Sequence, residues 1–316
     1  MNYPKVSIII LNWNGLEDTI ECLESLKKIT YPNYEVIVVD NGSKGNDAQV
    51  LQEKFGDYIY VIQNDKNYGF AKGANIGMRY VLDNSVPDYV LLLNNDTVVD
   101  PEFLTEMIKV AEADPAIGIT GAKIYWYDRP DRLQFVWGKI DFWRREITPI
   151  LKRVVEKIRG AELDKGQYDE IKEADWVIGA CFLIKEQVLK SIELLDEGYF
   201  CYGEETDYCL RAKQAGYKIV YVPKAKVWHK GHQSSKKVSE FARYYGVRSR
   251  FRLMRKHATR WQYRFFLIYF FGFYFWLATG YHLIYLHSLN ALASFRRGVK
   301  DGLFNSEASA KLYRRD

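Results

Sequence analysis

An unbroken apolar run that ends in two amides and a carboxylate constrains the fold of this chain more than any other feature. The run covers residues 89–93 and is followed at once by Asn94, Asn95 and Asp96. Such a run, with no alternating polar residues, is typical of a parallel strand buried on both faces. Ligands of open α/β sheets bind just outside the carboxyl ends of their strands. We therefore predict a ligand site at Asn94–Asp96.

A carboxylate in this position suits a hydrated divalent cation that takes phosphate oxygens as its other ligands. The simpler interpretation is that Asp96 caps the next helix. That interpretation is weaker because Asp100, Pro101 and Glu102 already supply a helix start four residues later. The sequence thus favours a metal-binding role for Asp96.

Strand and helix patterns alternate along most of the chain, whose 316 residues can bury a large core. The expected strands are 6–11, 34–39, 58–62, 89–93, 117–119, 176–184 and 218–222, and the expected helices are 16–26, 50–55, 103–111 and 210–214. This alternation predicts a three-layer α/β domain with a mostly parallel sheet.

The last eighty residues differ in kind from the rest. Residues 236–264 carry many lysines and arginines but one acid, Glu240, and residues 265–286 are almost wholly apolar or aromatic. About 20 apolar residues span a bilayer, and a basic segment beside them favours an anionic cytoplasmic leaflet. We expect contact with the cytoplasmic face of the cell membrane. A buried helix, or one packed on a second subunit, is the alternative, and spanning and interfacial modes both stay open.

Cysteine usage and net charge place few other limits on the chain. The four cysteines show no metal-ligand spacing, so reduced thiols in a cytosolic protein are expected. The first apolar run, Val6–Leu11, is too short for a signal peptide. The net charge of +5 is too modest to indicate a partner.

Further polar clusters follow other predicted strands. One is Asn12-Trp13-Asn14-Gly15, and a second is Asp40-Asn41-Gly42-Ser43. A carboxylate such as Asp40 accepts hydrogen bonds from a base or a ribose in other nucleotide-binding sheets, although an ordinary turn has the same composition. A third cluster has glycines that let the backbone approach a ligand closely. Its candidate contact residues are Asn67, Gly69, Phe70, Lys72, Gly73 and Asn75.

These clusters and several later segments resemble the inverting family 2 glycosyltransferases of GT-A fold, in the branch that includes rhamnosyltransferases and galactofuranosyltransferases. The resemblance covers about residues 5 to 235. The segments that carry it are 6–14, 38–43, 67–75, 94–96, 176–181, 195–197, 202–211 and 228–229.

The resemblance implies a role for each matching residue. Asp96 stands at the last carboxylate of the family's DxD metal motif, where Mg²⁺ or Mn²⁺ would bind, and Asn94 replaces its first carboxylate. His229 matches a histidine that completes the metal site in some members, with His232 as a fallback. Residues implied to contact the donor nucleotide are Asn12, Asn14, Asp40, Asn41, Ser43, Asn67, Gly69, Phe70, Lys72, Gly73, Asn75, Asn94 and Asn95. Those implied to line the sugar or acceptor pocket are Trp176, Gly179, Ala180, Cys181 and Tyr202.

An acidic cluster supplies the remaining chemistry. Glu204, Glu205 and Asp207 are the candidate catalytic acids, and Glu205 matches the family's general base. An inverting transfer needs a carboxylate to take the acceptor's hydroxyl proton and a cation to neutralise the departing diphosphate. The alternative is that these acids only occupy a helix N-terminus, where negative charge is favoured.

The resemblance also implies an organisation of the chain. We expect a glycosyltransferase domain at 1–235, with a nucleotide-binding half at 1–122, an acceptor half at 123–235 and an insertion near 140–173. Residues 236–316 would form a helical membrane-associating region.

The function expected from these features is transfer of one sugar from a UDP- or dTDP-linked donor to a lipid-linked or glycan acceptor. A sugar-1-phosphate nucleotidyltransferase and a non-catalytic nucleotide- or nucleic-acid-binding module are the alternatives. We expect no nucleic-acid partner, because the apolar stretch beside the basic segment favours a membrane surface. The sequence does not indicate the donor sugar or the oligomeric state.

Overall fold

The computed structural model describes residues 3–143, 161–231, 240–308 and 310, so His232 lies outside the described residues. The chain divides into two compact units. The first comprises 1–139, 162–200 and 204–231, and the second comprises 140–161, 201–203 and 232–316.

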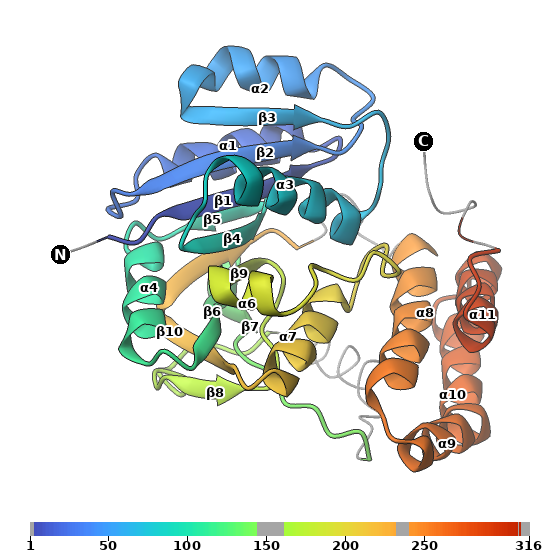
Figure 1. Ribbon diagram of the computed structural model, residues 1–316. Helices are drawn as coiled ribbons and strands as arrows, with labels where there is room; N and C mark the ends of the chain where they lie inside the picture. The colour runs from blue at the N-terminus through green and yellow to red at the C-terminus, as the bar shows by residue number, and fades with distance from the viewer. Residues whose placement is uncertain (1–2, 144–160, 232–239, 309, 311–316) are drawn as a thin grey trace. The chain divides into compact units, whose positions relative to one another are not determined.

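The first unit is built on one twisted sheet whose leading strands are parallel (Figure 1). These strands are β1 (Val6–Asn12), β2 (Tyr34–Asp40), β3 (Ile59–Gln63) and β4 (Tyr89–Asn94). They lie in the order β3-β2-β1-β4, and their pairings with one another are parallel. β1, β2 and β4 are apolar runs buried along most of their length, as the sequence predicts, whereas β3 at the edge of the sheet is only partly buried.

The other half of the sheet is mixed. Its strands are β5 (Thr97–Val99), β6 (Ile117–Trp126), β7 (Arg129–Phe135), β8 (Lys172–Ala174), β9 (Cys181–Lys185) and β10 (Lys218–His229). β9 lies antiparallel between β4 and β6, whereas β6 and β10 are parallel to each other. The remaining strands pair antiparallel with β6 or β10.

One strand prediction is wrong over half of its length. Residues 176–180 are not part of the expected 176–184 strand, because β9 begins only at Cys181, opposite Leu93. β4 ends one residue later, and the carbonyl of Ala180 accepts from the amide of Asn94 at 3.0 Å. The chain before Cys181 therefore turns away from the sheet at the edge where the polar clusters lie.

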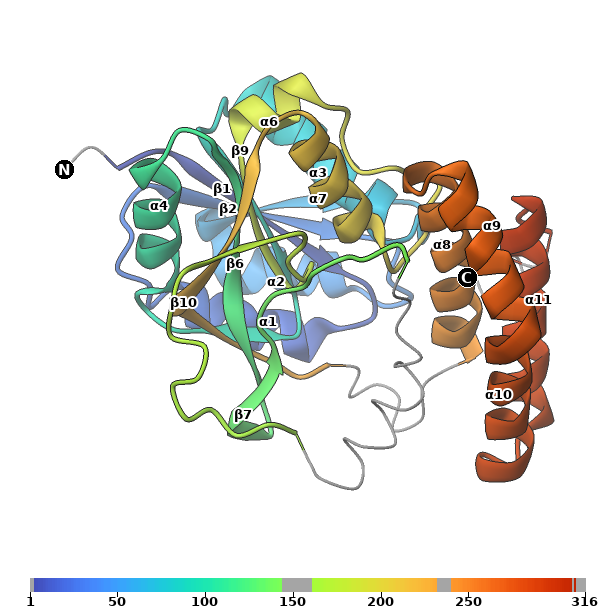
Figure 2. The ribbon, with the colours of Figure 1, turned by 90° about the horizontal axis from the view of Figure 1, so that it is seen from below.

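Helices cover both faces of this sheet, which confirms the predicted three-layer architecture. α1 (Leu16–Leu26), α2 (Asp47–Phe55) and α4 (Phe103–Ala113) contribute to one apolar core. α3 (Phe70–Asn84), α6 (Glu186–Ser191) and α7 (Glu204–Gln214) contribute to the other. Figure 2 shows α1 across the sheet from α3, α6 and α7. A short 3₁₀ turn, η1 (Gly56–Tyr58), leads into β3.

The second unit is helical. Its described elements are α8 (Glu240–His257), α9 (Arg260–Tyr269), the π turn η2 (Phe270–Tyr274), α10 (Phe275–Gly280), the π turn η3 (Tyr281–Tyr285) and α11 (Leu289–Phe304). Residues 260–285 form a continuous helical run, long and apolar enough to cross a membrane, and its most apolar 18-residue window has a mean hydropathy of 1.3. An apolar core of its own joins this run to α8 and α11.

Candidate active site

Parallel pairing brings the predicted polar clusters to one edge of the sheet. Asn12 at the end of β1 is in register with Asp40 at the end of β2, and Leu11 is in register with Asn94 at the end of β4. The carboxyl ends of these three strands therefore lie side by side, as the sequence predicts.

Asn12 organises the first part of this edge. Its side-chain amide is fully buried and donates to Asp40 Oδ1 at 2.7 Å and to Asp47 Oδ2 at 3.0 Å. Asp40, 1% exposed, also accepts from the backbone amide of Ser43 at 3.2 Å and from the hydroxyl of Ser43 at 2.6 Å. Asp40 thus orders its own loop. Sequence reasoning missed Asp47, because an acid in the first turn of a helix carries no distinct signal.

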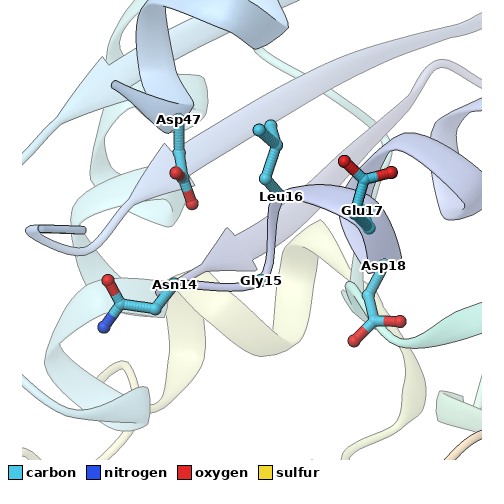
Figure 3. A pocket seen from close by; sticks show the side chains of 6 residues that line it. All are labelled: Asn14, Gly15, Leu16, Glu17, Asp18 and Asp47. Atoms are coloured by element: carbon cyan, nitrogen blue, oxygen red, sulfur yellow. The ribbon is translucent and has the colours of Figure 1, made fainter. Parts of the chain in front are cut away.

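A pocket of about 390 Å³ opens beside this network (Figure 3). Three carboxylates, from Glu17, Asp18 and Asp47, line it together with Asn14. Asn14 has a left-handed backbone, with φ 51°, and its side-chain oxygen accepts from the amide of Lys44 at 2.8 Å. The acidic lining favours hydrogen-bond donors such as a base N–H or a ribose hydroxyl over a phosphate.

The glycine-rich segment is held by Asn41, which is 1% exposed. Its side-chain nitrogen donates to Asn67 Oδ1 and to the carbonyl of Gly69, both at 3.1 Å. Gly69 has φ +83°, and a Cβ there would lie 2.5 Å from the carbonyl oxygen of Phe200. The next amide, of Phe70, donates to that carbonyl at 2.7 Å. A side chain at residue 69 would therefore break this junction.

Other residues of this segment serve packing. A Cβ on Gly73 would lie 2.6 Å from Leu11 Cδ1, so the glycine allows α3 to lie close on the sheet. Asn75 is 1% exposed and exchanges hydrogen bonds with the backbone of Leu195, at 2.9 and 3.0 Å. Lys72 places its ammonium 4.4 Å from the ring centre of Tyr68. For Asn75 the structure shows a bracing contact between α3 and the loop before α7 in place of the predicted contact with the donor.

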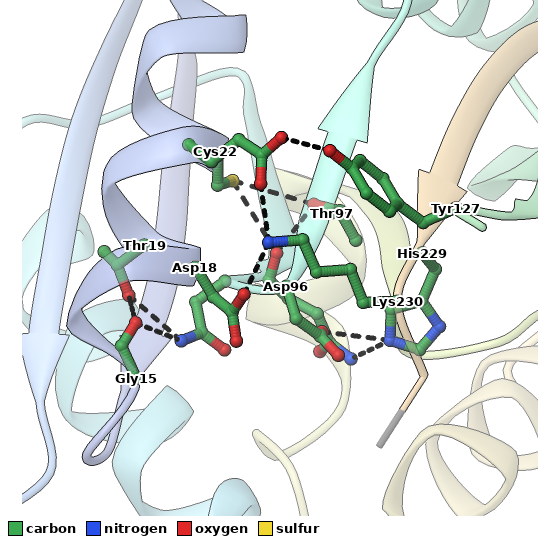
Figure 4. Close-up of polar contacts among 12 residues, drawn as sticks. Gly15, Asp18, Thr19, Cys22, Asp96, Thr97, Tyr127, His229 and Lys230 are labelled. Carbon is green, nitrogen blue, oxygen red and sulfur yellow. Dashed lines mark hydrogen bonds and ion pairs between the residues drawn. The ribbon is translucent and has the colours of Figure 1, made fainter. Parts of the chain in front are cut away.

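A histidine far away in sequence meets the end of β4. β5 pairs with β10 so that Thr97 is opposite His229. His229 Nε2 consequently lies 3.0 Å from Asp96 Oδ1 (Figure 4). It also lies 3.3 Å from Nδ2 of Asn94, which is 135 residues earlier in the sequence. Asn95 turns the other way and donates to Thr19 Oγ1 at 3.0 Å.

Gln134 on β7 fixes the orientation of this histidine. Its side-chain oxygen lies 2.6 Å from His229 Nδ1, and its nitrogen lies against Gly231, where a Cβ would come within 2.5 Å. With Nδ1–H donated to Gln134, the Nε2 lone pair points toward the Asp96 carboxylate. Two acceptors at 3.0 Å repel each other unless a proton or a cation lies between them. The sequence analysis missed Gln134, because no sequence motif marks a glutamine on a short edge strand as part of a site.

We call Asn94, Asp96, His229 and Gln134 the metal-site cluster. Its ligand atoms fit a divalent cation. Carboxylate oxygen and neutral imidazole are both established ligands, and a second hydrogen bond on the imidazole is the usual support. Among the residues that the structure describes, no group of three or more His, Cys, Asp or Glu side chains converges to hold a metal. The protein thus offers few ligands, which is typical of a cation that also binds substrate phosphates.

Lys230 ties this cluster to α1. Its ammonium lies 2.5 Å from Asp18 Oδ1 and 2.5 Å from Glu21 Oε2, and Tyr127 donates to the same glutamate (Figure 4). Burial opposes the charge on Lys230, but the hydrogen bonds to Asp18 and Glu21 outweigh it and raise the pKa of the lysine. The end of β10 is therefore anchored beside His229.

The acid pair, Glu204 and Glu205, begins α7. Glu204 is 6% exposed, and within the described residues its Oε2 atom is buried without a hydrogen-bond partner. Burial, and then the charge of Glu205, raise the pKa of Glu204 well above its usual range. Glu205 is half-buried, accepts from Thr206 Oγ1 at 3.2 Å and lies next to Gly179, where a Cβ would be 3.6 Å from the Cβ of Glu205. Of the two acids, Glu204 is therefore the one whose surroundings favour the protonated form.

Two predicted site residues lie in structural positions instead. Asp207 is fully buried and forms an ion pair with Arg211 Nε at 2.9 Å, and the same arginine donates to the carbonyls of Glu193 and Leu194. Cys181 is a fully buried residue of the apolar core on β9, where burial raises the pKa of its thiol. Neither side chain is exposed to a substrate, because helix and strand packing encloses both.

The other predicted pocket residues have mixed surroundings. Trp176 packs on Phe135, with ring centres 4.7 Å apart, so the packing alternative describes it well. Ala180 is 2% exposed and contributes its carbonyl to Asn94. Tyr202 belongs to the second unit, has a left-handed backbone with φ 68° and lies edge-on to Phe241. The structure describes all four cysteines, and each is a thiol outside any disulfide.

Comparison with known proteins is consistent with this arrangement. The model of a family described as "Glycosyltransferase like family 2" matches residues 4–264. Rhamnosyltransferase WbbL of Escherichia coli (strain K12) is 28% identical over 258 residues, which are 79% of this chain and 93% of that protein. The low-salt glycan biosynthesis hexosyltransferase Agl10 of Haloferax volcanii is 27% identical over 214 residues, 68% of this chain and 63% of that protein. An N-acetylglucosaminyl-diphospho-decaprenol L-rhamnosyltransferase of Mycobacterium tuberculosis is 22% identical over 232 residues, 68% and 72% of the two chains.

Solved structures share the fold at low identity. A mannosyltransferase from Pyrobaculum calidifontis, in complex with GDP-Man and Mn²⁺, superposes with a TM-score of 0.56 at 15% identity and covers 99% of this chain and 79% of its own. TarS 1–349 of S. aureus with UDP-GlcNAc gives 0.57 at 16% identity, covering 98% and 83%. These likenesses show the GT-A fold that the sequence predicts. Because the family model matches most of its length, the chain belongs to the family 2-like glycosyltransferases and is a glycosyltransferase.

Proposed function

We propose that the protein catalyses an inverting, metal-assisted transfer of one sugar from a nucleoside-diphosphate donor to a hydroxyl of a lipid-linked or glycan acceptor during cell-envelope polysaccharide synthesis. The observation that carries the proposal is the contact of His229 Nε2 with Asp96 Oδ1 at 3.0 Å, supported by Gln134, at the carboxyl edge of the sheet. Ligands of such sheets bind at this edge.

Asp96 and His229 would hold a divalent cation, with Asn94 as an additional neutral contact. Such a cation supplies neutralisation of the charge that develops on the departing diphosphate. Asn12 keeps the Asp40 loop ordered, so that the pocket beside Asn14 can take the nucleoside. These residues bind and orient the donor, and none of them exchanges a proton in the transfer.

Glu205 acts on the acceptor side. As the acceptor oxygen forms its bond to the anomeric carbon, that carbon's bond to the diphosphate oxygen breaks on the opposite face, and the hydroxyl proton moves to Glu205. Burial and the charge of Glu205 raise the pKa of Glu204, so we assign the proton of the pair to Glu204 and the role of base to Glu205. Gly179 leaves the space beside Glu205 open.

The relatives' names support a sugar and an acceptor class. Two of them are rhamnosyltransferases, and one of these is named for an N-acetylglucosaminyl-diphospho-decaprenol acceptor. We therefore propose a UDP- or dTDP-linked donor and a lipid-linked acceptor, with rhamnose as the first sugar to assay. The apolar helical run of the second unit, and the basic residues of α8, support a place on the cytoplasmic face of the membrane.

Thermal unfolding with UDP, dTDP and GDP and their sugar conjugates, with and without Mn²⁺, tests the donor site. A ligand that binds only the folded chain stabilises it by about 2.7 kcal/mol at 100 times its Kd. We expect one nucleotide class to stabilise the wild type in a Mn²⁺-dependent manner. Asp96→Ala should lose this effect, and Asp83→Ala, on the exposed surface of α3, should keep it. Equal stabilisation of both variants would contradict the metal assignment.

A further inference from the structure

The helical run 260–285 is held along one face by the rest of the second unit. Its buried residues recur every fourth position, at Phe266, Phe270, Tyr274, Ala278 and His282. Four residues overshoot one α-helical turn by about 40°, and the wider π turns η2 and η3 compensate for this drift. The irregular turns thus keep a straight seam against α8 and α11.

This seam is an aromatic core with partners on both neighbouring helices. Phe251 of α8 lies 5.0 Å from Phe266 and 4.8 Å from Phe270, measured between ring centres. Phe295 of α11 lies 5.3 Å from His282. A helix that crossed a bilayer on its own would lose these contacts.

The neighbouring helices are too polar to enter the hydrocarbon with it. Arg248 is 5% exposed and bonds to Glu307 at 2.7 Å, and Asp301 is fully buried and accepts from Tyr244 at 2.7 Å. Arg250 of α8 lies over the ring of Tyr274 on the seam itself, at 5.1 Å. Charged groups in the membrane interior are strongly disfavoured.

The opposite face of the run is apolar and exposed. Trp261 is 68%, Ile268 73%, Trp276 65% and Ile284 77% exposed, and only 22% of the most apolar window is buried. An exposed apolar surface of this kind marks an interaction site. A core helix of a soluble protein would be mostly buried, so the exposed face separates this run from that alternative.

Basic residues at the beginning of the run indicate what covers this face. Lys256, Arg260 and Arg264 are exposed there, and the guanidinium of Arg264 lies 5.0 Å from the ring centre of Trp261. Cationic side chains beside tryptophan, on an otherwise apolar face, match the headgroup region of an anionic leaflet.

We propose that residues 260–285 lie flat in the interface of an anionic membrane leaflet, with the face of Trp261, Ile268, Trp276 and Ile284 inserted, and do not span the bilayer. This inference deepens the membrane association proposed above. The bound surface is a lipid leaflet, and the seam stays packed on α8 and α11.

Binding of the full chain to vesicles tests the surface. We expect cosedimentation with phosphatidylglycerol-containing vesicles, weaker with phosphatidylcholine alone, and at least tenfold weaker for Ile268→Lys. Ile171→Lys is the matched control, because Ile171 is 58% exposed in the first unit. Unchanged binding of Ile268→Lys, or a failure to bind vesicles with concentration-dependent dimers instead, would overturn the proposal.

Tryptophan depth tests the mode of binding. Trp261 and Trp276 are 15 positions apart, about 22 Å along a helix axis. We expect shallow brominated lipids to quench both residues equally, read from the difference between wild type and Trp261→Phe or Trp276→Phe. Deep quenching of Trp276 with shallow quenching of Trp261 would show a spanning helix. Nucleotide-induced stabilisation in the same samples reports the donor site separately, so either proposal can fail alone.

Discussion

The cluster around His229 and the acid pair of α7 arrange negative charge in opposite ways. The cluster comprises Asn94, Asp96, His229 and Gln134. In the cluster, Gln134 holds the imidazole so that His229 Nε2 faces the Asp96 carboxylate at 3.0 Å. In the acid pair, Glu204 is buried with one carboxylate oxygen unpartnered among the described residues, and its pKa is raised by burial and by Glu205. The cluster concentrates acceptors that attract a cation, whereas the acid pair excludes a second negative charge.

This difference matches the two roles proposed above, cation binding at the cluster and proton transfer at the acid pair. A carboxylate oxygen and an imidazole nitrogen that meet across a short distance suit a divalent cation between them. Two carboxyl groups that share an enclosed site keep a proton between them, which leaves a single base. Cation binding at the cluster depends mainly on the geometry of its ligand atoms. Proton transfer at the acid pair depends mainly on which of the two carboxyl groups is protonated.

The largest expected effect follows from removing the base. Glu205→Gln keeps the shape of the side chain but cannot accept the hydroxyl proton, so transfer should fall by about 10²- to 10⁴-fold. Donor binding, measured by nucleotide-induced stabilisation, should remain within a few-fold of wild type. Glu53→Gln, on the exposed surface of α2, is the control and should be neutral. Transfer by Glu205→Gln within a few-fold of wild type would exclude Glu205 as the base.

A smaller effect is expected at Gln134, and it tests the cluster alone. Gln134→Met removes the acceptor for His229 Nδ1–H, so we expect Mn²⁺ to bind about 10- to 100-fold more weakly. Gln134→Glu keeps an acceptor there and should bind Mn²⁺ at least as tightly as wild type. Electron paramagnetic resonance of free Mn²⁺ in a titration measures both without an activity assay. Equal affinities of the Met and Glu variants would show that Gln134 only fills space.

The sequence predicted those parts of the site that neighbouring parallel strands bring together. Asn12, Asp40 and Asn94 end strands β1, β2 and β4, which are neighbours in the sheet, so their alignment follows from strand pairing. His229 came from the family resemblance, because no local pattern indicates that β10 continues past its predicted end at residue 222 to reach Asp96. Gln134 carried no signal.

The errors have a common physical cause. Apolar character predicts burial but does not distinguish a pocket wall from a core, so Cys181 was placed at the site although it lies within the core on β9. The run 176–184 was predicted as one strand for the same reason, but β4 ends at Asn94 and offers no partner beyond it. Asp207 was grouped with the acid pair by proximity in sequence, and the helix turns its carboxylate toward Arg211.

The smallest effect on activity is expected at Glu204. Burial and the charge of Glu205 raise the pKa of Glu204, which favours its neutral form, and Glu204→Gln replaces that form by a neutral group of the same shape. We expect transfer at pH 7 within about threefold of wild type. A loss as large as that of Glu205→Gln would show that Glu204 is the ionised member of the pair.

The same substitution should nevertheless change how stability depends on pH. In the unfolded chain Glu204 loses its proton near its ordinary pKa, about 4.3, while the folded protein keeps the proton to a higher pH. The folded state therefore binds more protons in that window, and wild-type stability falls as pH rises, by up to about 1.4 kcal/mol per pH unit from this group. Urea unfolding from pH 4 to 8 gives the free energy of unfolding of both proteins. The stability of Glu204→Gln relative to wild type should be constant below the unfolded-state pKa of Glu204 and should increase with pH above it. A difference that stays constant across this range would mean that Glu204 ionises normally in the folded protein.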